Sequence, residues 1–279
     1  MPRKRRRGVA VALTVILLCA GAGAVAYHEL VPLLRGSACE ARTSAGTVRI
    51  STDQAAGAAT IAAVGLRKDM PRRGVTIALA AAWQESKLHN LSYGDRDSVG
   101  LFQQRPSQGW GTRKQLRDPV YASSRFYDAL RHVPDYPSLS IAEAAQRVQR
   151  SADGTAYIRH KEEARVLSKA LTGTEPTALH CWYPDDGDVG AAKAPEVRRE
   201  LARVFGPQHI RVGTGGLTVT PGGPRRGWAV ATWAVAHAKR LGLSGVAYQG
   251  RRWNAPEGFT GWQPADDAHH RVRISLRPR

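Results

Sequence analysis

Residues 80–88, AAAWQESKL, and residues 93–104, YGDRDSVGLFQQ, decide the fold of the central part of this chain. The first stretch ends an apolar segment, and the second surrounds a short apolar core with Gly, Asp and Ser. At helical spacing, Glu85 shares one face with Ala78, Ala81 and Ala82. The carboxyl group of Glu85 is therefore expected at the edge of an apolar surface, where loss of hydration raises the pKa of a carboxyl group.

The Glu-Ser pair at 85–86, followed after a loop by Gly-Leu-Phe-Gln-Gln at 100–104, carries a family resemblance. It resembles the Glu-Ser and Gly-Leu-Met-Gln motifs of lytic transglycosylases and goose-type lysozymes, in an actinobacterial membrane-anchored form. The resemblance runs from about Thr52 to Gly173. It implies a lysozyme-like fold and cleavage of the peptidoglycan glycan strand between N-acetylmuramyl and N-acetylglucosamine units, without a cofactor.

The resemblance implies that Glu85 is the catalytic residue. As a general acid it would protonate the glycosidic oxygen while the sugar passes through an oxocarbenium-like state. As a base it would then take the proton of the muramyl 6-hydroxyl, which closes a 1,6-anhydro ring. The downstream Ala-Tyr-Asn-x-Gly stretch of the family is replaced here by AQRVQRS at 145–151.

Five polar or aromatic residues correspond to substrate-binding positions of that family. Tyr157 is expected to bond to the acid or to the sugar, and the others to line the groove: Tyr93, Ser98, Gln103 and Gln104. The alternative for Ser98 and the two glutamines is that they satisfy a bent backbone. Asp95 and Asp97 present a similar choice, because they either position a water molecule, which makes the enzyme a hydrolase, or form an ordinary turn.

Local signals predict mainly helices in this part of the chain. Asp118-Pro119 is an N-cap followed by Pro at the first helical position, and residues 140–143 form a capping box. The region 92–111 is expected to be an irregular or β-hairpin lobe, and a short strand is expected at 47–50. Helices are predicted at 55–68, 75–88, 118–131, from 140 onward, and at 156–171.

The C-terminal part is expected to be a connector, 182–226, and a small α+β domain, 227–279. The connector contains a helical stretch at 195–204 and Gly-rich residues 212–223. Within the small domain we expect a helix at 228–239 and strands at 245–248 and 272–276.

The small domain carries Gly227-Trp228, WAVA at 233–236, Leu241-Gly242, Tyr248, RRW at 251–253 and Trp262. With these residues it resembles a degenerate module of actinobacterial wall proteins related to D-Ala-D-Ala carboxypeptidases. The resemblance makes a zinc site conceivable, but the His followed six residues later by Asp that active members would lead us to expect is missing. This absence favours a metal-free module that binds the wall or a partner. Trp253 and Trp262 are either core residues or platforms for sugar and peptide. The metal-ligand types available are His237, Asp266, Asp267, His269 and His270.

The amino terminus predicts a membrane anchor within residues 1–35. Basic residues at 3–7 precede an apolar run at 9–26, and a bilayer takes about 20 apolar residues as one helix. Clustered basic residues stay on the cytoplasmic side, so the rest of the chain is expected outside the cell membrane. The alternative is a secreted protein cleaved after Ala26.

Cysteine usage and charge agree with an extracytoplasmic protein. Cys39 and Cys181 are expected to form a disulfide that brackets the lysozyme-like domain, 36–181. The formal net charge of +18 requires polyanionic partners or a solvated basic surface. Anionic wall polymers or lipid headgroups are favoured over nucleic acid, because the chain carries an export signal.

The predicted fold class is therefore α+β, with a mainly helical lysozyme-like domain after a transmembrane helix, followed by the small α+β domain. The competing hypothesis for function is a catalytically weak scaffold that binds peptidoglycan at the cell surface.

Overall fold

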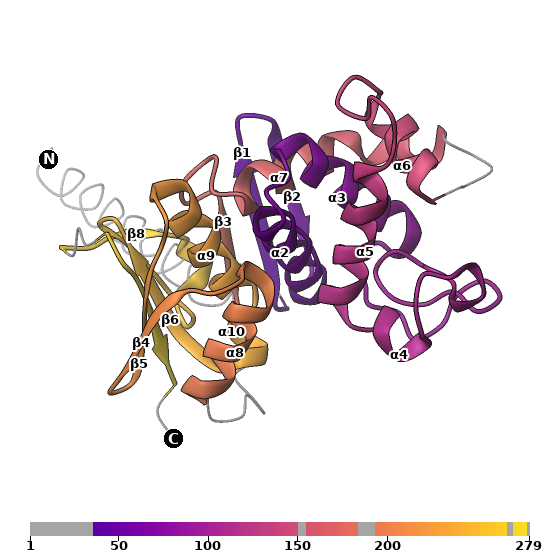
Figure 1. The fold of residues 1–279 in the computed structure, drawn as a ribbon. Helices are drawn as coiled ribbons and strands as arrows, with labels where there is room; N and C mark the ends of the chain where they lie inside the picture. Colours follow the sequence, from indigo (N-terminus) through magenta and orange to yellow (C-terminus); the bar gives the residue numbers. More distant parts are fainter. Residues whose placement is uncertain (1–35, 150–154, 184–192, 267–269, 278–279) are drawn as a thin grey trace, which may run out of the picture.

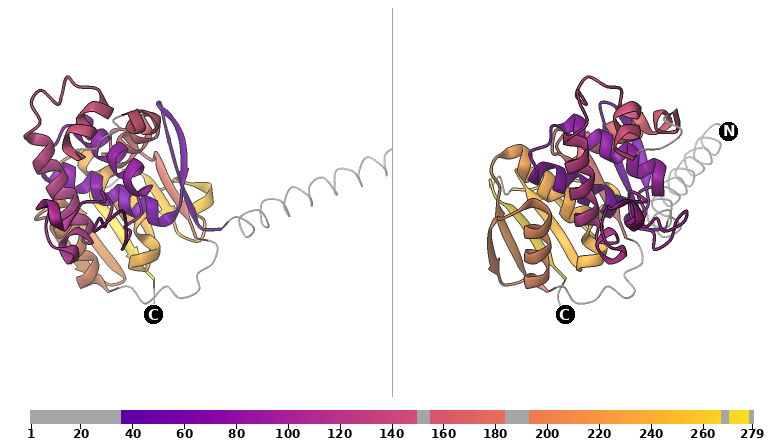
Figure 2. Two further views of the ribbon diagram at one scale, coloured as in Figure 1. Left: turned by 90° about the vertical axis from the view of Figure 1, so that its right-hand side faces the viewer. Right: turned by 45° about the vertical axis from the view of Figure 1, so that its right-hand side comes forward.

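The computed structural model describes residues 36–149, 155–183, 193–266 and 270–277. It is an α+β protein in which a helical part and a six-stranded sheet lie side by side (Figure 1). Two further directions show the same arrangement (Figure 2). No helix among these residues is long and apolar enough to cross a membrane. The anchor predicted within residues 1–35 lies outside the described residues.

A three-stranded antiparallel sheet opens and closes the helical part. Its order is β2-β1-β3, with β1 at Ala38–Thr43, β2 at Gly46–Ile50 and β3 at Leu179–Trp182. The strand expected at 47–50 is β2. Cys39 lies directly opposite Cys181 in the β1–β3 register, and the two form a disulfide, which confirms the predicted pairing.

The helices opened by Asp118 and Ser140 begin where the sequence signals place them, whereas those predicted at 55 and 75 begin three residues earlier. Ser51 and Gln54 form a capping box at the start of α2, and the Asp118 carboxylate accepts from the backbone N–H of Val120 at the start of α5. The hydroxyl of Ser140 accepts from the backbone N–H of Glu143 at 3.1 Å, as a capping box requires. The helices are α2 Thr52–Arg67, α3 Arg72–Ser86, α4 Arg113–Leu116, α5 Pro119–Arg131 and α6 Ile141–Gln149.

One segment differs in detail from the sequence prediction, while the 92–111 lobe has one of its two predicted forms. The helix expected at 156–171 is a 3-10 helix, η2 at Thr155–His160, followed by α7 at Lys161–Leu171. The 92–111 lobe is irregular, with isolated bridges from Leu91 to Gly100 and from Val99 to Gln104. A second 3-10 helix, η1, lies in the lobe at Pro106–Gln108.

The second sheet contains six antiparallel strands in the order β4-β5-β9-β6-β7-β8. Its first two strands lie within 182–226, where the sequence analysis expects a connector. Residues 209–220 therefore belong to the sheet. The signal was missed because the Gly-rich composition of 212–223 reflects a tight hairpin and not a linker. The strands are β4 His209–Gly213, β5 Gly216–Thr220, β6 Leu243–Tyr248, β7 Arg251–Asn254, β8 Gln263–Pro264 and β9 Val272–Leu276.

The described helices that pack on this sheet lie on the face turned toward α2 (Figure 1). They are α8 Ala194–Phe205, α9 Pro224–Ala236 and α10 Ala238–Leu241. Leu217, Val219, Val246 and Ile274 point to these helices and are at most 3% exposed. Because the side chains of a strand alternate between its two faces, every second residue faces the opposite side.

Two tryptophans of the C-terminal part dock on the outer edge of β3. The indole Nε1 of Trp253 donates to the carbonyl oxygen of Cys181 at 3.0 Å, and that of Trp262 donates to Leu179 at 2.7 Å. Trp253 is fully buried and Trp262 is 9% exposed. Both are therefore core residues of the junction between the two parts, in place of exposed platforms for sugar or peptide.

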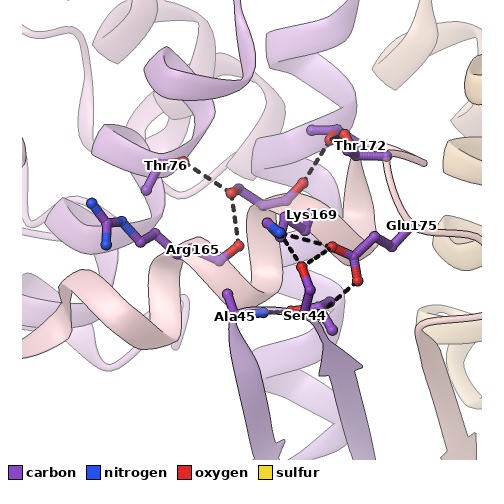
Figure 3. A network of polar contacts seen from close by, with 10 residues as sticks. Ser44, Ala45, Thr76, Arg165, Lys169, Thr172 and Glu175 are labelled. Atoms are coloured by element: carbon purple, nitrogen blue, oxygen red, sulfur yellow. Dashed lines mark hydrogen bonds and ion pairs between the residues drawn. The ribbon is translucent and has the colours of Figure 1, made fainter.

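A polar network fixes the β1–β2 turn to the end of α7 (Figure 3). The Glu175 carboxylate accepts from the Ser44 backbone N–H at 2.8 Å and from Lys169 Nζ at 2.8 Å. The Lys169 ammonium group and the Ser44 donors lower the pKa of Glu175 to about 2. Deeper inside, the hydroxyls of Thr76 and Ser168 lie 2.9 Å apart, which joins α3 to α7.

Replacing both cysteines tests how far the disulfide supports the fold. Cys39→Ala with Cys181→Ala is expected to lower the free energy of unfolding by about 2–5 kcal/mol, because the unfolded chain loses a long closed loop. Urea unfolding measures this difference. Reductant should destabilise the wild type and leave the double variant unchanged. Equal stability of the two oxidised proteins would contradict the prediction.

Candidate active site

Glu85 lies in the last turn of α3, where the helix ends abruptly. Lys87 adopts a left-handed conformation with φ 52°, and the backbone N–H of Leu88 donates back to Ala82. This C-terminal cap turns the chain away directly after the Glu-Ser pair. The carboxyl group of Glu85 is consequently carried at the rim of a helix whose remaining turns are buried in the core.

Ser86 connects this helix end to the Gly-Leu-Phe-Gln-Gln segment. Its buried hydroxyl lies 2.7 Å from the carbonyl oxygen of Leu101 and 3.1 Å from that of Ala82. Gly100 is required in this segment, because its φ is 81° and a Cβ atom there would collide with the carbonyl oxygen of Leu116. The two motifs recognised in the sequence are therefore in direct contact.

Tyr157 is the nearest predicted site residue to Glu85. Its phenol hydroxyl donates to Oε1 of Glu85 at 2.6 Å, and the tyrosine is 1% exposed. His160, at the end of the same 3-10 helix, places Nε2 3.2 Å from Oε1 of Gln84. η2 is thus held against α3. The sequence analysis names Glu85 or the sugar as the partner of Tyr157, and in the structure Tyr157 hydrogen-bonds to Glu85.

Gln149 is a site residue that the sequence analysis missed. Its Nε2 donates to the carbonyl oxygen of Phe102 at 2.7 Å, and its side chain also hydrogen-bonds to the Glu85 carboxyl group. Gln149 lies in the segment 145–151, which departs from the family motif. The position of that segment after the lobe is the signal that could have drawn attention to it.

Burial and hydrogen bonds act in opposite directions on Glu85. Burial has the larger effect and raises the pKa of the Glu85 carboxyl group, while the hydrogen bonds from Tyr157 and Gln149 favour the carboxylate and lower it. The net result is a raised pKa. A carboxyl group in this environment retains its proton to higher pH than an exposed glutamate, which is the property a general acid needs.

The lobe residues predicted to bind substrate occupy two kinds of position. Tyr93 is 69% exposed, and Gln103 is half-buried with its Nε2 3.1 Å from the carbonyl oxygen of Gly100. Ser98 is 6% exposed and Gln104 2% exposed. The Nε2 atom of Gln104 lies 3.5 Å from the carbonyl oxygen of Ala122 in α5. Gln104 therefore has a core position, in place of the groove-lining one expected.

Asp97 is committed to the internal structure of the lobe. Its carboxylate accepts from Arg105 Nε at 2.7 Å and from the Ser107 backbone N–H at 2.8 Å. The hydrogen bond from Arg105 is the main reason that the pKa of Asp97 lies well below its usual range. Asp95 is exposed, and its Oδ2 atom lies 3.9 Å from Nε of Arg96. This geometry favours the turn interpretation for both aspartates.

Glu85 lines none of three cavities in the described part of the protein. The largest, about 570 Å³, lies between α2, α8 and α10. Its wall carries Arg203, which pairs with Asp118 and Glu200, and Arg240, which lies 3.6 Å from Glu200. The charges of this cavity are therefore largely neutralised by one another.

His237 lines the same cavity but is held in the core. Its ring stacks on Trp233, Nδ1 lies 2.9 Å from the Trp233 carbonyl oxygen, and Nε2 lies 3.3 Å from the Thr60 hydroxyl. Burial lowers the pKa of His237 to about 3. Among the described residues no three His, Cys, Asp or Glu side chains could hold a metal ion together. Asp267 and His269 lie outside the described residues.

Comparison with known families gives one match. Residues 212–272, from the end of β4 to the start of β9, match the model of a family described as VldE, C-terminal domain. The match covers most of the six-stranded sheet and α9, but it does not reach the Glu85 site. It names a different family from the carboxypeptidase-like resemblance. A search of curated proteins found no match to this sequence.

Removing the tyrosine hydroxyl tests the hydrogen bond at Glu85. Tyr157→Phe is expected to raise the pKa of Glu85 further, because the variant loses a donor that stabilises the carboxylate. Titration of the labelled Glu85 carboxyl carbon by NMR measures the change. Tyr136→Phe, in the loop after α5, is the control and should leave the Glu85 titration unchanged. An unchanged curve for Tyr157→Phe would refute the interaction.

His237 predicts a loss of stability in acid. Its folded pKa of about 3 lies below the value of about 6.5 in an unfolded chain. The unfolded state therefore binds the extra proton first, so stability falls as the pH drops below 6.5, by about 2 kcal/mol at pH 5. Chemical unfolding at pH 7 and pH 5 should show a smaller difference for His237→Gln than for the wild type. An identical difference would contradict the prediction.

Proposed function

We propose that this protein cleaves the glycan strand of peptidoglycan between N-acetylmuramyl and N-acetylglucosamine units, with Glu85 as its acid and then its base. The observation that carries the proposal is the environment of that one carboxyl group. It lies at the rim of α3, its pKa is raised by burial, and it bonds to Tyr157 and Gln149. Glycoside cleavage needs such a protonated carboxyl group beside the scissile oxygen.

The chemistry follows from the two protonation states of Glu85. The protonated group donates to the glycosidic oxygen, and the carboxylate that remains stands beside the developing positive charge on the sugar. Tyr157 and Gln149 stabilise that carboxylate by hydrogen bonds, so they favour the state formed as the bond breaks. The carboxylate then takes the proton of the muramyl 6-hydroxyl while that oxygen bonds to the anomeric carbon of the same sugar, in place of the departed glycosidic oxygen. The muramyl residue is left with a 1,6-anhydro ring, and Glu85 is protonated again.

The proposal includes the setting in which the reaction takes place. Residues 36–181 act as a lysozyme-like domain outside the cell membrane, anchored by the transmembrane helix predicted within residues 1–35. The Cys39–Cys181 disulfide is suited to that oxidising compartment. The C-terminal residues contact the wall or a partner, and no cofactor takes part.

A specific observation supports the scaffold as a second candidate. Glu85 lines none of the three cavities, each of about 530–570 Å³. Gln104 and Ser98, expected to bind sugar, are buried. A protein that kept the lysozyme-like arrangement with a narrow groove would bind peptidoglycan at the surface and cleave it slowly or not at all.

Product analysis separates the two functions. Full-length protein in non-ionic detergent is incubated with purified sacculi, and released anhydro-muropeptides are measured by mass spectrometry. Glu85→Gln, which keeps the size of the side chain but cannot donate the acidic proton, should reduce release at least about 100-fold. Glu143→Gln, an exposed carboxyl-to-amide change on α6, is the matched control and should retain activity.

The pH dependence offers a second readout. Wild-type activity should fall as the pH rises through the raised pKa of Glu85, and Tyr157→Phe should move that alkaline limb to higher pH. Release of ordinary reducing ends in place of anhydro ends would identify a hydrolase. Binding to sacculi without any release would support the scaffold, and equal release by wild type and Glu85→Gln would remove Glu85 from the mechanism.

A further inference from the structure

Three arginines occupy one cross-strand row of the six-stranded sheet. The register pairs Arg211 of β4 with Thr218, Thr218 with Arg273 of β9, Arg273 with Ala247, and Ala247 with Arg252 of β7. Each arginine is thus separated from the next by one strand that carries a small residue. Since neighbouring strands lie about 4.8 Å apart, successive arginines recur about every 10 Å across the sheet. We refer to Arg211, Arg273 and Arg252 as the arginine row.

The arginine row lies on the side of the sheet opposite α8, α9 and α10. Its neighbours in sequence along β9, Val272 and Ile274, are buried against the helices, so Arg273 between them faces the other way. The same alternation holds in β7, where Trp253 is buried and Arg252 is exposed. All three arginines are exposed.

The rest of this face reinforces its positive character. His209 and Arg271 have the same parity as Arg211 and Arg273, and both are exposed. The six strands contain no Asp or Glu.

We infer that the arginine row binds a flexible linear polyanion of phosphodiester-linked alditols, the chemistry of an anionic wall polymer. A charged group repeated along a flexible chain can reach cations spaced at a regular interval, and guanidinium groups bind phosphate oxygens by paired hydrogen bonds. The residues between the arginines, Thr218 and Ala247, are small, so a polymer chain can lie across the row from one arginine to the next.

Side-chain types on this face favour that occupant over two other polyanions. Proteins that bind single-stranded nucleic acid add aromatic side chains on which bases stack, and the positions that share the face of the arginine row on the described strands carry no Phe, Tyr or Trp. Proteins that settle on a bilayer insert large apolar side chains, and the same positions carry Thr, Ser, Ala, Gly, Asn and Gln beside the basic residues.

The site is independent of glycan cleavage. The helical part that holds Glu85 lies on the helix-covered side of the six-stranded sheet (Figure 1), and the alternation of side chains turns the arginine row to the opposite side. Binding of the polymer would therefore survive the loss of the Glu85 carboxyl group, and a Glu85→Gln protein can be used to measure it.

The test compares two triple variants with the same change in net charge. Arg211→Gln with Arg252→Gln and Arg273→Gln removes the row, whereas Lys193→Gln with Arg198→Gln and Arg199→Gln removes three exposed charges at α8, on the helical side. The full chain in non-ionic detergent is titrated with purified poly(glycerol phosphate) at several NaCl concentrations. A matched single-stranded oligonucleotide and vesicles of phosphatidylglycerol are titrated in parallel.

The row variant should bind poly(glycerol phosphate) at least about tenfold more weakly. The slope of its log affinity against log salt concentration should be shallower by about two to three, since about two to three fewer counterions are released. The α8 variant should stay within about twofold of the wild type. Thr218→Glu, which places one carboxylate inside the row, should weaken binding without removing any arginine and guards against misfolding of the triple variant. Equal weakening by both triple variants, or a row-dependent preference for the oligonucleotide or the vesicles, would overturn the proposal.

Discussion

The structure depends on the edge strand β3, which both halves of the molecule use. One edge pairs with β1 through a register that places Cys39 opposite Cys181. On its other edge, the carbonyl groups of Leu179 and Cys181 accept from the indoles of Trp262 and Trp253. An unpaired strand edge is otherwise a site for aggregation. In this protein β3 closes the helical part through the disulfide to β1, and its other edge holds the C-terminal part through the two indole hydrogen bonds.

Helix caps set by near neighbours in sequence were predictable, and strand pairing between distant segments was not. The Cys39–Cys181 disulfide is a distant pairing that was predicted, because these are the two cysteines left outside the predicted anchor. The caps at Asp118 and Ser140 lie within three residues of the groups they satisfy, so α5 and α6 begin as predicted. β1 and the β4–β5 hairpin were missed because their stability comes from partners elsewhere in the chain, β3 and β9. Composition alone made the hairpin resemble a linker.

The same distinction applies to the site. The Glu-Ser and Gly-Leu-Phe-Gln-Gln motifs identify Glu85 and its connection to the lobe, since Ser86 and Leu101 are close in sequence. Gln149 reaches the same carboxyl group only because α6 ends beside Phe102. No local pattern marks that contact. The burial of Gln104 was equally hidden, because it depends on how closely the lobe packs on α5.

Charge is distributed in opposite ways on the two halves of the protein. At Glu85 a single carboxyl group is partly removed from water, where burial makes its ionisation costly and hydrogen bonds offset part of that cost. On the arginine row the side chains are exposed, so each contact with a polyanion is weak and sensitive to salt. Several weak contacts would hold a polymer while still allowing it to slide. Under the proposed function, a holding surface of that kind would keep the Glu85 carboxyl group near the glycan without fixing it at one bond.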